Sequence, residues 1–161
     1  MHNGIVSEKI VRGGAGWERA SLALDEQLCF ALYAASRAVT AAYRPLLSRL
    51  GLTYPQYLVM LVLWERGAVP VKELGEALRL DYGTLSPLLK RLEAAELIRR
   101  TRQPSDERSV LVEPTAAGRA LRRRAHRVPA AIGAATGLSA REARRLRDQL
   151  TALTDRLAES A

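Results

Sequence analysis

The segment between residues 71 and 112 constrains the fold of this chain most, because several local patterns follow one another there. Residues 71–78 are short and amphipathic, and after a two-residue turn Asp81 can cap a second helix. Leucines recur at helical spacing in that second helix, at Leu85, Leu88, Leu89 and Leu92. Two strands then flank a proline-containing turn, at residues 97–102 and 108–112. Both strands carry arginine on the side of the turn. Helix, turn, helix and basic hairpin in this order predict a winged helix-turn-helix.

The segments before this pattern also predict helices. Leucine, alanine and valine carry most of the 48% hydrophobic content and aromatic residues are 5%, which favours helices over a β-sandwich. An apolar stripe at helical spacing begins near Asp25, and Pro45 should kink or end that helix because proline lacks an amide hydrogen. Thr53 and Gln56 fit a capping box for a second, almost wholly apolar helix that stops at Gly67.

The chain after the hairpin predicts further helices, so the expected fold class is mainly α with a small β-hairpin wing. Thr115 can cap one helix, and three residues should interrupt it: Pro129, Gly133 and Gly137. A second capping box, Ser139 with Glu142, begins the last helix. Leucines in that helix alternate spacings of four and three, at Leu146, Leu150, Leu153 and Leu157. This seam fits packing within one subunit and packing between two subunits equally well.

Charge and cysteine content limit the classes of function. The net charge is +8 and only three of the 25 basic residues are lysine, which indicates a polyanionic partner that arginine can grip with a forked contact. Charge alone does not separate nucleic acid from a membrane surface. A secretory signal and an apolar run long enough to span a bilayer are both missing, so we expect a cytoplasmic protein. One cysteine excludes an intrachain disulfide and a multi-cysteine metal site, and no cofactor is expected.

The single cysteine, Cys29, lies near the start of the first predicted helix. A thiolate rather than a thiol attacks a peroxide, so a sensor cysteine needs hydrogen-bond donors or a helix dipole to stabilise its charge. No lysine, arginine or histidine lies within four residues of it, but Tyr33 follows on the same helix face. Tyr43 would lie about 21 Å further along a continuous helix, within reach only of a partner's cysteine. The alternative is an inert, buried core cysteine.

These residues resemble the MarR family of transcription regulators, and within it the organic-hydroperoxide-sensing, OhrR-type branch. The resemblance covers roughly residues 22–158, and three stretches carry it: 24–33 with the cysteine, the TYPQY sequence at 53–57, and 81–92 followed by 106–109. It implies an obligate homodimer whose reduced form represses and whose cysteine, matched by Cys29, releases DNA when oxidised. Tyrosines matching Tyr43 and Tyr54 would reach the cysteine across the interface, with Tyr33 close by.

The resemblance also implies an organisation and a subtype. Residues 21–50 and 115–161 would be dimerisation helices, and 51–114 would be the DNA-binding lobe. Residues 1–20 lie outside the resemblance, and their glycines and lack of a sustained period predict a flexible extension. With no second cysteine the chain is similar to the one-Cys subtype, in which a small cellular thiol captures the sulfenic acid. Glu96 stands where the family usually has the glycine that closes the reading helix. Because a left-handed glutamate is disfavoured, we expect that helix to end differently.

The helix after Asp81 should enter the major groove of a pseudo-palindromic operator through its first residues. Tyr82 stands where the family commonly has a small residue, so base contacts there are not copied from relatives. The candidate contacts on this helix are Tyr82, Thr84, Ser86, Pro87, Lys90 and Arg91, the first three being exposed and polar and the last two suiting phosphate. The alternative for Ser86 and Pro87 is ordinary first-turn helix chemistry.

In the predicted wing, Arg108 should enter an A·T-rich minor groove and Asp106 should orient it, although the two could form only a local turn pair. Arg102, together with Arg99 and Arg100, would add phosphate contacts. The sequence thus predicts a redox-sensing repressor of a peroxide-detoxification gene rather than an enzyme. A one-Cys thiol peroxidase and a MarR-type repressor released by a phenolic ligand remain as alternatives.

Overall fold

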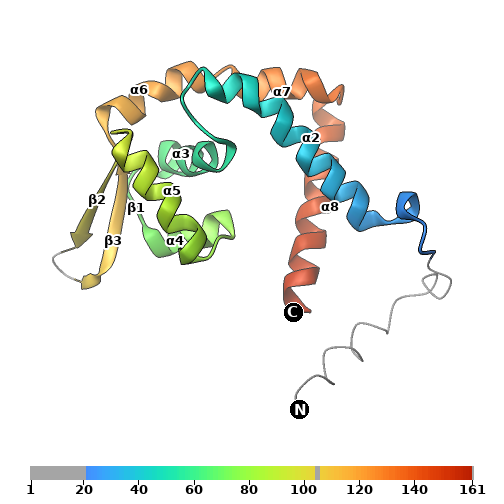
Figure 1. The fold of residues 1–161 in the computed structure, drawn as a ribbon, viewed down its shortest axis with the longest axis horizontal. Helices are drawn as coiled ribbons and strands as arrows, with labels where there is room; N and C mark the ends of the chain where they lie inside the picture. The colour runs from blue at the N-terminus through green and yellow to red at the C-terminus, as the bar shows by residue number, and fades with distance from the viewer. Residues whose placement is uncertain (1–20, 104–105, 161) are drawn as a thin grey trace, which may run out of the picture. The chain divides into compact units, whose positions relative to one another are not determined.

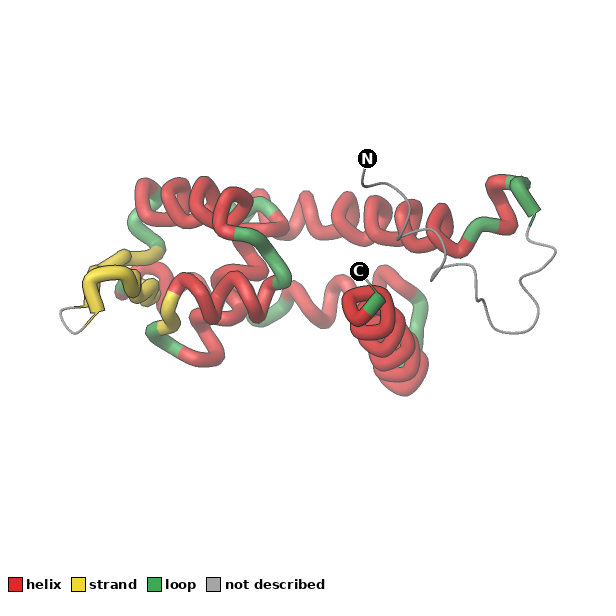
Figure 2. Tube along the Cα trace, turned by 90° about the horizontal axis from the view of Figure 1, so that it is seen from below, coloured by secondary structure: helices red, strands yellow, loops and turns green. Residues whose placement is uncertain are grey.

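The computed structural model describes residues 21–103 and 106–160, with the backbone alone described for 103 and 106–109. The residues fall into two compact units (Figure 1). We call Val39–Ala135 the central unit, and residues 21–38 with 136–160 the terminal unit. Helices make up most of both units, and the strands belong to the central unit (Figure 2). The predicted extension at residues 1–20 lies outside the described part of the chain.

Helix α2 (Leu28–Ser48) runs from the terminal unit into the central unit. The terminal unit also holds a 3-10 turn, η1 (Leu24–Glu26), and helix α8 (Ala140–Glu159). The other elements follow in chain order as α3 (Tyr54–Arg66), β1 (Val69–Pro70), α4 (Val71–Leu78), α5 (Tyr82–Ala94), β2 (Ile98–Gln103), β3 (Asp106–Pro114), α6 (Ala116–Ala125) and α7 (Val128–Thr136). The prediction of a mainly helical winged fold is confirmed.

The four helix starts predicted from capping residues are confirmed, and each is determined by local hydrogen bonds. Thr53 and Gln56 form a capping box at α3, and Ser139 and Glu142 form another at α8. The side chains of Asp81 and Thr115 accept backbone N–H groups at the starts of α5 and α6. A residue that satisfies its own neighbours' amides needs no distant contact, so a short sequence window is enough to find it.

The predicted effects of the prolines and glycines are partly wrong. Helix α2 begins at Leu28 rather than near Asp25, and it continues through Pro45 to Ser48. Pro129 is the second residue of α7, where its missing N–H costs no helical hydrogen bond. Gly133 lies inside the same helix, and the chain turns beyond it at Gly137, which has a φ of 68°. The break after α6 therefore precedes Pro129.

The end of α5 departs from the prediction, because Glu96 adopts the left-handed conformation, with a φ of 57°. Its N–H donates to the carbonyl oxygen of Glu93 at 2.9 Å, and the N–H of Leu97 donates to Leu92 at 3.0 Å. These two bonds make a Schellman motif, which satisfies the last carbonyls of the helix. The side chain of Thr115 donates to the Glu96 carbonyl oxygen at 2.6 Å and helps to hold the turn.

The sheet has one strand more than the sequence predicts. Strand β1 pairs antiparallel with β3, with Val69 opposite Val112, and the strand order is β1-β3-β2. The hairpin pairs Ile98 with Pro114 and continues to Gln103 opposite Asp106, so the connection is shorter than the predicted turn. A two-residue strand has no alternation of its own to read, because its existence depends on a partner more than 40 residues away.

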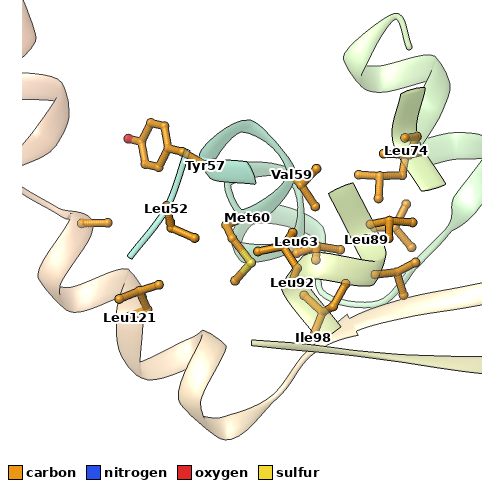
Figure 3. Close-up of a cluster of buried hydrophobic side chains, with 14 of the residues drawn as sticks. Leu52, Tyr57, Val59, Met60, Leu63, Leu74, Leu89, Leu92, Ile98 and Leu121 are labelled. Carbon is orange, nitrogen blue, oxygen red and sulfur yellow. The ribbon is translucent and has the colours of Figure 1, made fainter. Parts of the chain in front are cut away.

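The core of the central unit forms around α3. Figure 3 shows Met60 and Leu63 between Leu121 of α6 on one side and Leu89 and Leu92 of α5 on the other. These side chains are at most 5% exposed. Burial of each such side chain stabilises the fold by about 1.5–3 kcal/mol relative to exposure. Helix α3 therefore fixes the place of the reading helix relative to α6.

Candidate functional site

The start of α5 presents the residues predicted to read DNA. Tyr82 is 72% exposed, and Pro87, Lys90 and Arg91 are also exposed. Ser86 is half-buried rather than fully exposed, and Pro87 is the sixth residue of the helix. First-turn helix chemistry therefore does not explain the Ser86-Pro87 pair.

Asp81 and Thr84 form the cap of this helix. The Oδ1 atom of Asp81 accepts the Thr84 N–H at 2.9 Å, and its Oδ2 atom accepts the Thr84 hydroxyl at 2.8 Å. These two hydrogen bonds lower the pKa of Asp81 below its usual value. Because the Thr84 proton is given to the cap, its hydroxyl oxygen remains as an acceptor for a DNA group that donates.

The wing arginines behave differently from the prediction that all three face phosphate. Arg100 binds Glu93 of α5 through its guanidinium and its backbone N–H, and this arginine lowers the pKa of Glu93. Arg99 donates to its cross-strand partner Glu113. Arg100 therefore ties the wing to α5, and Arg99 pairs with the neighbouring strand at the surface of the wing. Arg102 is exposed and forms no ion pair among the side chains that the structure describes. The side chains of Asp106 and Arg108 lie outside that part.

A cavity of about 800 Å³ lies between α4, the start of α5 and the wing. Its lining includes Lys72, Arg79, Tyr82, Ser86 and Arg100. The reading helix is therefore flanked by a hollow that both cationic and acidic side chains line, Glu76 and Asp81 among them.

Cys29 is the second residue of α2 and is exposed. It is therefore not buried in this chain, whereas the alternative from the sequence placed it in a buried core. The first turn of a helix has N–H groups that lack acceptors within the helix, and Cys29 lies in that turn. Just before it, the Gln27 side chain donates to the carbonyl oxygens of Ser21 and Ala23, which holds the chain leading into the helix.

Tyr33, one turn after Cys29, has a partner that sequence reasoning missed. Arg37 donates from Nη1 to the Tyr33 hydroxyl oxygen at 2.9 Å, and its guanidinium lies 5.5 Å from the ring centroid. The phenolic oxygen thus accepts from a cation and keeps its own O–H to donate. The i, i+4 spacing from Tyr33 to Arg37 was the available signal.

In the central unit the structure brings Tyr43 and Tyr54 together, with ring centroids 4.7 Å apart. Burial, and then the neighbouring Tyr54, raises the pKa of Tyr43 above the usual tyrosine value of 10.0. Its hydroxyl therefore stays protonated and can donate at any physiological pH. Tyr57 joins them at 5.8 Å from the Tyr43 ring and was not predicted as a site residue, although it is the second tyrosine of the TYPQY sequence.

Other kinds of site find no support in the described ranges. No group of three or more histidine, cysteine or acidic side chains could hold a metal ion among the described side chains, those of residues 21–102 and 110–160. In the same part of the chain no helix combines the length and the apolar character needed to cross a bilayer.

The comparisons with known proteins agree with this geometry. Residues 52–110 match the MarR family. The chain is 52% identical over 134 residues to the HTH-type transcriptional regulator TtmR of Methylorubrum extorquens (strain PA1), covering 83% of this chain and 69% of the relative. It is 46% identical over 134 residues to the organic hydroperoxide resistance transcriptional regulator of Bacillus subtilis (strain 168), covering 83% and 91%.

Among solved structures, reduced AbfR of Staphylococcus epidermidis bound to DNA has a TM-score of 0.69 and 35% identity, covering 84% of this chain and 94% of that one. Residues 52–110, the segment matched by the family, contain the helix-turn-helix and most of the wing. The chain therefore belongs to the MarR family and is a MarR-type transcriptional regulator with a winged-helix DNA-binding fold.

Proposed function

We propose that this protein is a redox-sensing repressor. The reduced homodimer binds a pseudo-palindromic operator, and oxidation of Cys29 by an organic hydroperoxide releases the DNA and derepresses a peroxide-detoxification gene. One observation carries the proposal: the single thiol of the chain is exposed in the first turn of α2, in a protein similar to a regulator of organic hydroperoxide resistance.

The chemical step needs no metal or cofactor. The Cys29 thiolate attacks the terminal peroxide oxygen, an S–O bond forms, the O–O bond breaks, and the departing alkoxide takes a proton to leave as an alcohol. Sulfur is oxidised and the peroxide is reduced by the same two electrons. The apolar side chains of Leu28 and Phe30 beside Cys29, 53% and 39% exposed, would favour an organic substituent over hydrogen peroxide.

The product, a sulfenic acid, would be captured by a small cellular thiol. The incoming sulfur forms a disulfide with Cys29 and the sulfenic oxygen leaves as water. The sequence contains no second cysteine. Another copy of this chain could therefore offer only its Cys29 as a resolving thiol. A mixed disulfide is bulkier than a thiolate and carries no charge at sulfur, so the hydrogen bonds that stabilised the thiolate are lost.

Exposed apolar faces support the dimer. The α8 seam is open to solvent in this chain, with Leu146, Leu150 and Leu157 at 45%, 38% and 62% exposure. Apolar residues that recur at a seam spacing and stay exposed are expected to pack against a second subunit. Tyr43 follows Cys29 by fourteen residues on one helix, about 21 Å by helix rise, so it would serve the partner's Cys29.

The same dimer would place two reading helices on successive turns of the operator. Tyr82, Ser86 and Pro87 would face bases or backbone, while Lys90, Arg91 and Arg102 would contact phosphate. Arg108, oriented by Asp106, would enter the minor groove. Arg99 and Arg100 are left out of the contacts that we propose, because their carboxylate partners lie within the chain.

The test is operator binding by fluorescence anisotropy during a cumene hydroperoxide titration, with a small thiol present. Wild type should lose the operator at one equivalent of peroxide per Cys29, and Cys29→Ser should keep it. Loss in both proteins would remove Cys29 from the mechanism and leave a ligand-released repressor as the better reading. Continuous peroxide consumption far beyond one equivalent would instead favour the thiol peroxidase.

A further inference from the structure

We infer that Tyr57 and Trp64 are positioning residues that connect the sensor tyrosines to the base of the wing. This inference rests on the proposed function, and it adds to it the internal route by which a change at Tyr43 reaches the DNA-binding surface. Four aromatic side chains of the central unit form what we call the aromatic row: Tyr54, Tyr43, Tyr57 and Trp64.

The aromatic row is continuous. Ring centroids are 4.7 Å apart from Tyr54 to Tyr43, 5.8 Å from Tyr43 to Tyr57, and 6.2 Å from Tyr57 to Trp64. The last pair meets edge to face, an arrangement that aromatic side chains prefer. The row therefore begins with Tyr54 at the start of α3 and passes to Tyr43 on α2. It returns to α3 at Tyr57 and ends at Trp64, near the other end of that helix.

Tyr57 has little freedom to absorb a displacement. It is 2% exposed, and Figure 3 shows its ring directed from α3 with the hydroxyl pointing away from Met60 and Leu63. Burial, and then the two neighbouring tyrosines, raises the pKa of this phenol, so it stays neutral. Because protein interiors are close-packed, a shift of the Tyr43 ring must move Tyr57 or open a void beside it.

The far end of the row binds α6, the helix that directly follows the wing in the chain. Trp64 donates from Nε1 to the carbonyl oxygen of Gly118, in the first turn of α6, at 2.8 Å. Gly118 lies directly on the backbone of Leu97, the residue before β2, so closely that a Cβ at Gly118 would come within 2.0 Å of the Leu97 oxygen. The N–H of Thr115 also donates to this Leu97 oxygen at 3.0 Å.

A displacement of Gly118 would therefore move Leu97 and with it the start of β2. This route uses the contact between Gly118 and Leu97 and no exposed side chain. Strand β2 carries Arg102, and Arg100 on the same strand binds Glu93 of the reading helix. The wing contains β2, and the reading helix is bound to β2 through Arg100 and Glu93. Both are therefore connected to the contact between Gly118 and Leu97. In the proposed mechanism, oxidised Cys29 withdraws its acceptor from Tyr43, and the aromatic row transmits the resulting ring movement to this point.

Two variants test the route. Trp64→Phe keeps a ring but removes the donor to Gly118, and Tyr57→Leu removes the central ring. Tyr57→Phe, which keeps the ring, is the conservative variant that should restore wild-type behaviour. Val59→Ala, a fully buried residue of the same helix outside the row, is the matched control for a simple loss of stability.

The measured quantity is the ratio of operator Kd in the oxidised and reduced states, alongside dimedone labelling of Cys29 sulfenic acid. We expect Trp64→Phe and Tyr57→Leu to lower this ratio at least five-fold, a typical coupling between two sites, with sulfenic acid formation and reduced-state Kd within about three-fold of wild type. Tyr57→Phe and Val59→Ala should keep the wild-type ratio. Unchanged ratios in the first two variants, or an equal loss in Val59→Ala, would overturn the inference.

Trp64 fluorescence gives a readout that does not depend on how the variants fold. In a Trp17→Phe background, which leaves Trp64 as the single tryptophan, peroxide should change the emission, and adding Cys29→Ser should abolish that change. A constant emission during Cys29-dependent operator release would refute the route alone. If wild type shows no Cys29-dependent release, the proposed function fails and this inference fails with it.

Discussion

The two units of this molecule use the same kind of amphipathic helix with opposite outcomes. In the central unit three leucines of α5 are at most 1% exposed, Leu85, Leu89 and Leu92, and Leu88 is half-buried. In the terminal unit Leu150 and Leu157 of α8 follow a comparable spacing but are 38% and 62% exposed. The difference teaches that an apolar stripe specifies a contact without saying whether the contact is made within the chain or with another copy.

The largest effect is expected when a charge is placed in the exposed leucine seam of α8. Leu150→Glu should abolish dimerisation and weaken operator binding more than 100-fold, because an unpaired charge at a packed seam costs several kcal/mol. Sedimentation velocity and anisotropy measure the two effects. Ala152→Glu adds the same charge two residues away, off the seam, and should do neither. A dimeric Leu150→Glu protein would show that the exposed seam is not the interface.

The next effect distinguishes the buried leucines of α5 from the exposed leucines of α8 by how unfolding depends on protein concentration. Leu89→Ala should lower the free energy of unfolding by about 2–5 kcal/mol at every protein concentration, since it opens a cavity inside one subunit. Leu150→Ala should have an effect that grows on dilution, because subunit association contributes to stability by mass action. Denaturant unfolding over a hundred-fold concentration range measures both. Parallel shifts for the two variants would contradict the distinction.

A smaller effect concerns the left-handed residue at the end of the reading helix. Glu96→Gly should raise the free energy of unfolding by about 1 kcal/mol, because glycine reaches a positive φ without the steric cost that other residues meet. The Schellman hydrogen bonds use backbone atoms and should persist. Thermal and urea unfolding measure the gain. A loss of stability would mean that the Glu96 side chain makes a contribution of its own.

The smallest effect compares one carboxylate in each unit. Arg100 lowers the pKa of Glu93 in the central unit, and the Ser139 cap lowers the pKa of Glu142 in the terminal unit, both below the usual 4.5. A depressed folded-state pKa contributes stability that is present above the unfolded value and is lost as pH falls through the folded one. Glu93→Gln and Glu142→Gln should each flatten the fall in stability below about pH 4.5.

Urea unfolding between pH 7 and pH 3 measures that slope, with the exposed Glu159 changed to Gln as a control. The effect at Glu93 should be the larger of the two, because its ion pair is less exposed to screening by water than the helix cap of Glu142. An unchanged slope in Glu93→Gln would show that the wing is held to α5 by its backbone bonds alone.

Local rules account for what could be predicted from the sequence. The caps at Asp81 and Thr115, the helix-turn-helix spacing and the hairpin all depend on residues within a few positions of one another, and each was confirmed. The sequence placed Cys29 near the start of a helix, and the structure places it in the first turn because α2 begins at Leu28 rather than near Asp25. Family membership followed from these motifs together.

Tertiary contacts decided the remainder. The sequence could not show that Arg100 binds Glu93, nor that Trp64 reaches Gly118 from 54 residues away. It also predicted that Glu96 would avoid a conformation that the turn against Thr115 in fact holds.

The sequence by itself thus determined where the capped helices begin, the order of helices and hairpin, and the family to which the chain belongs. The tertiary structure decided which arginines pair with carboxylates of the chain, which aromatic rings meet, and which leucine stripe is buried within the chain. The physical reason is range. Caps and turns are satisfied by neighbouring amides, whereas ion pairs, ring contacts and buried faces depend on partners that are brought close only when the whole chain has folded.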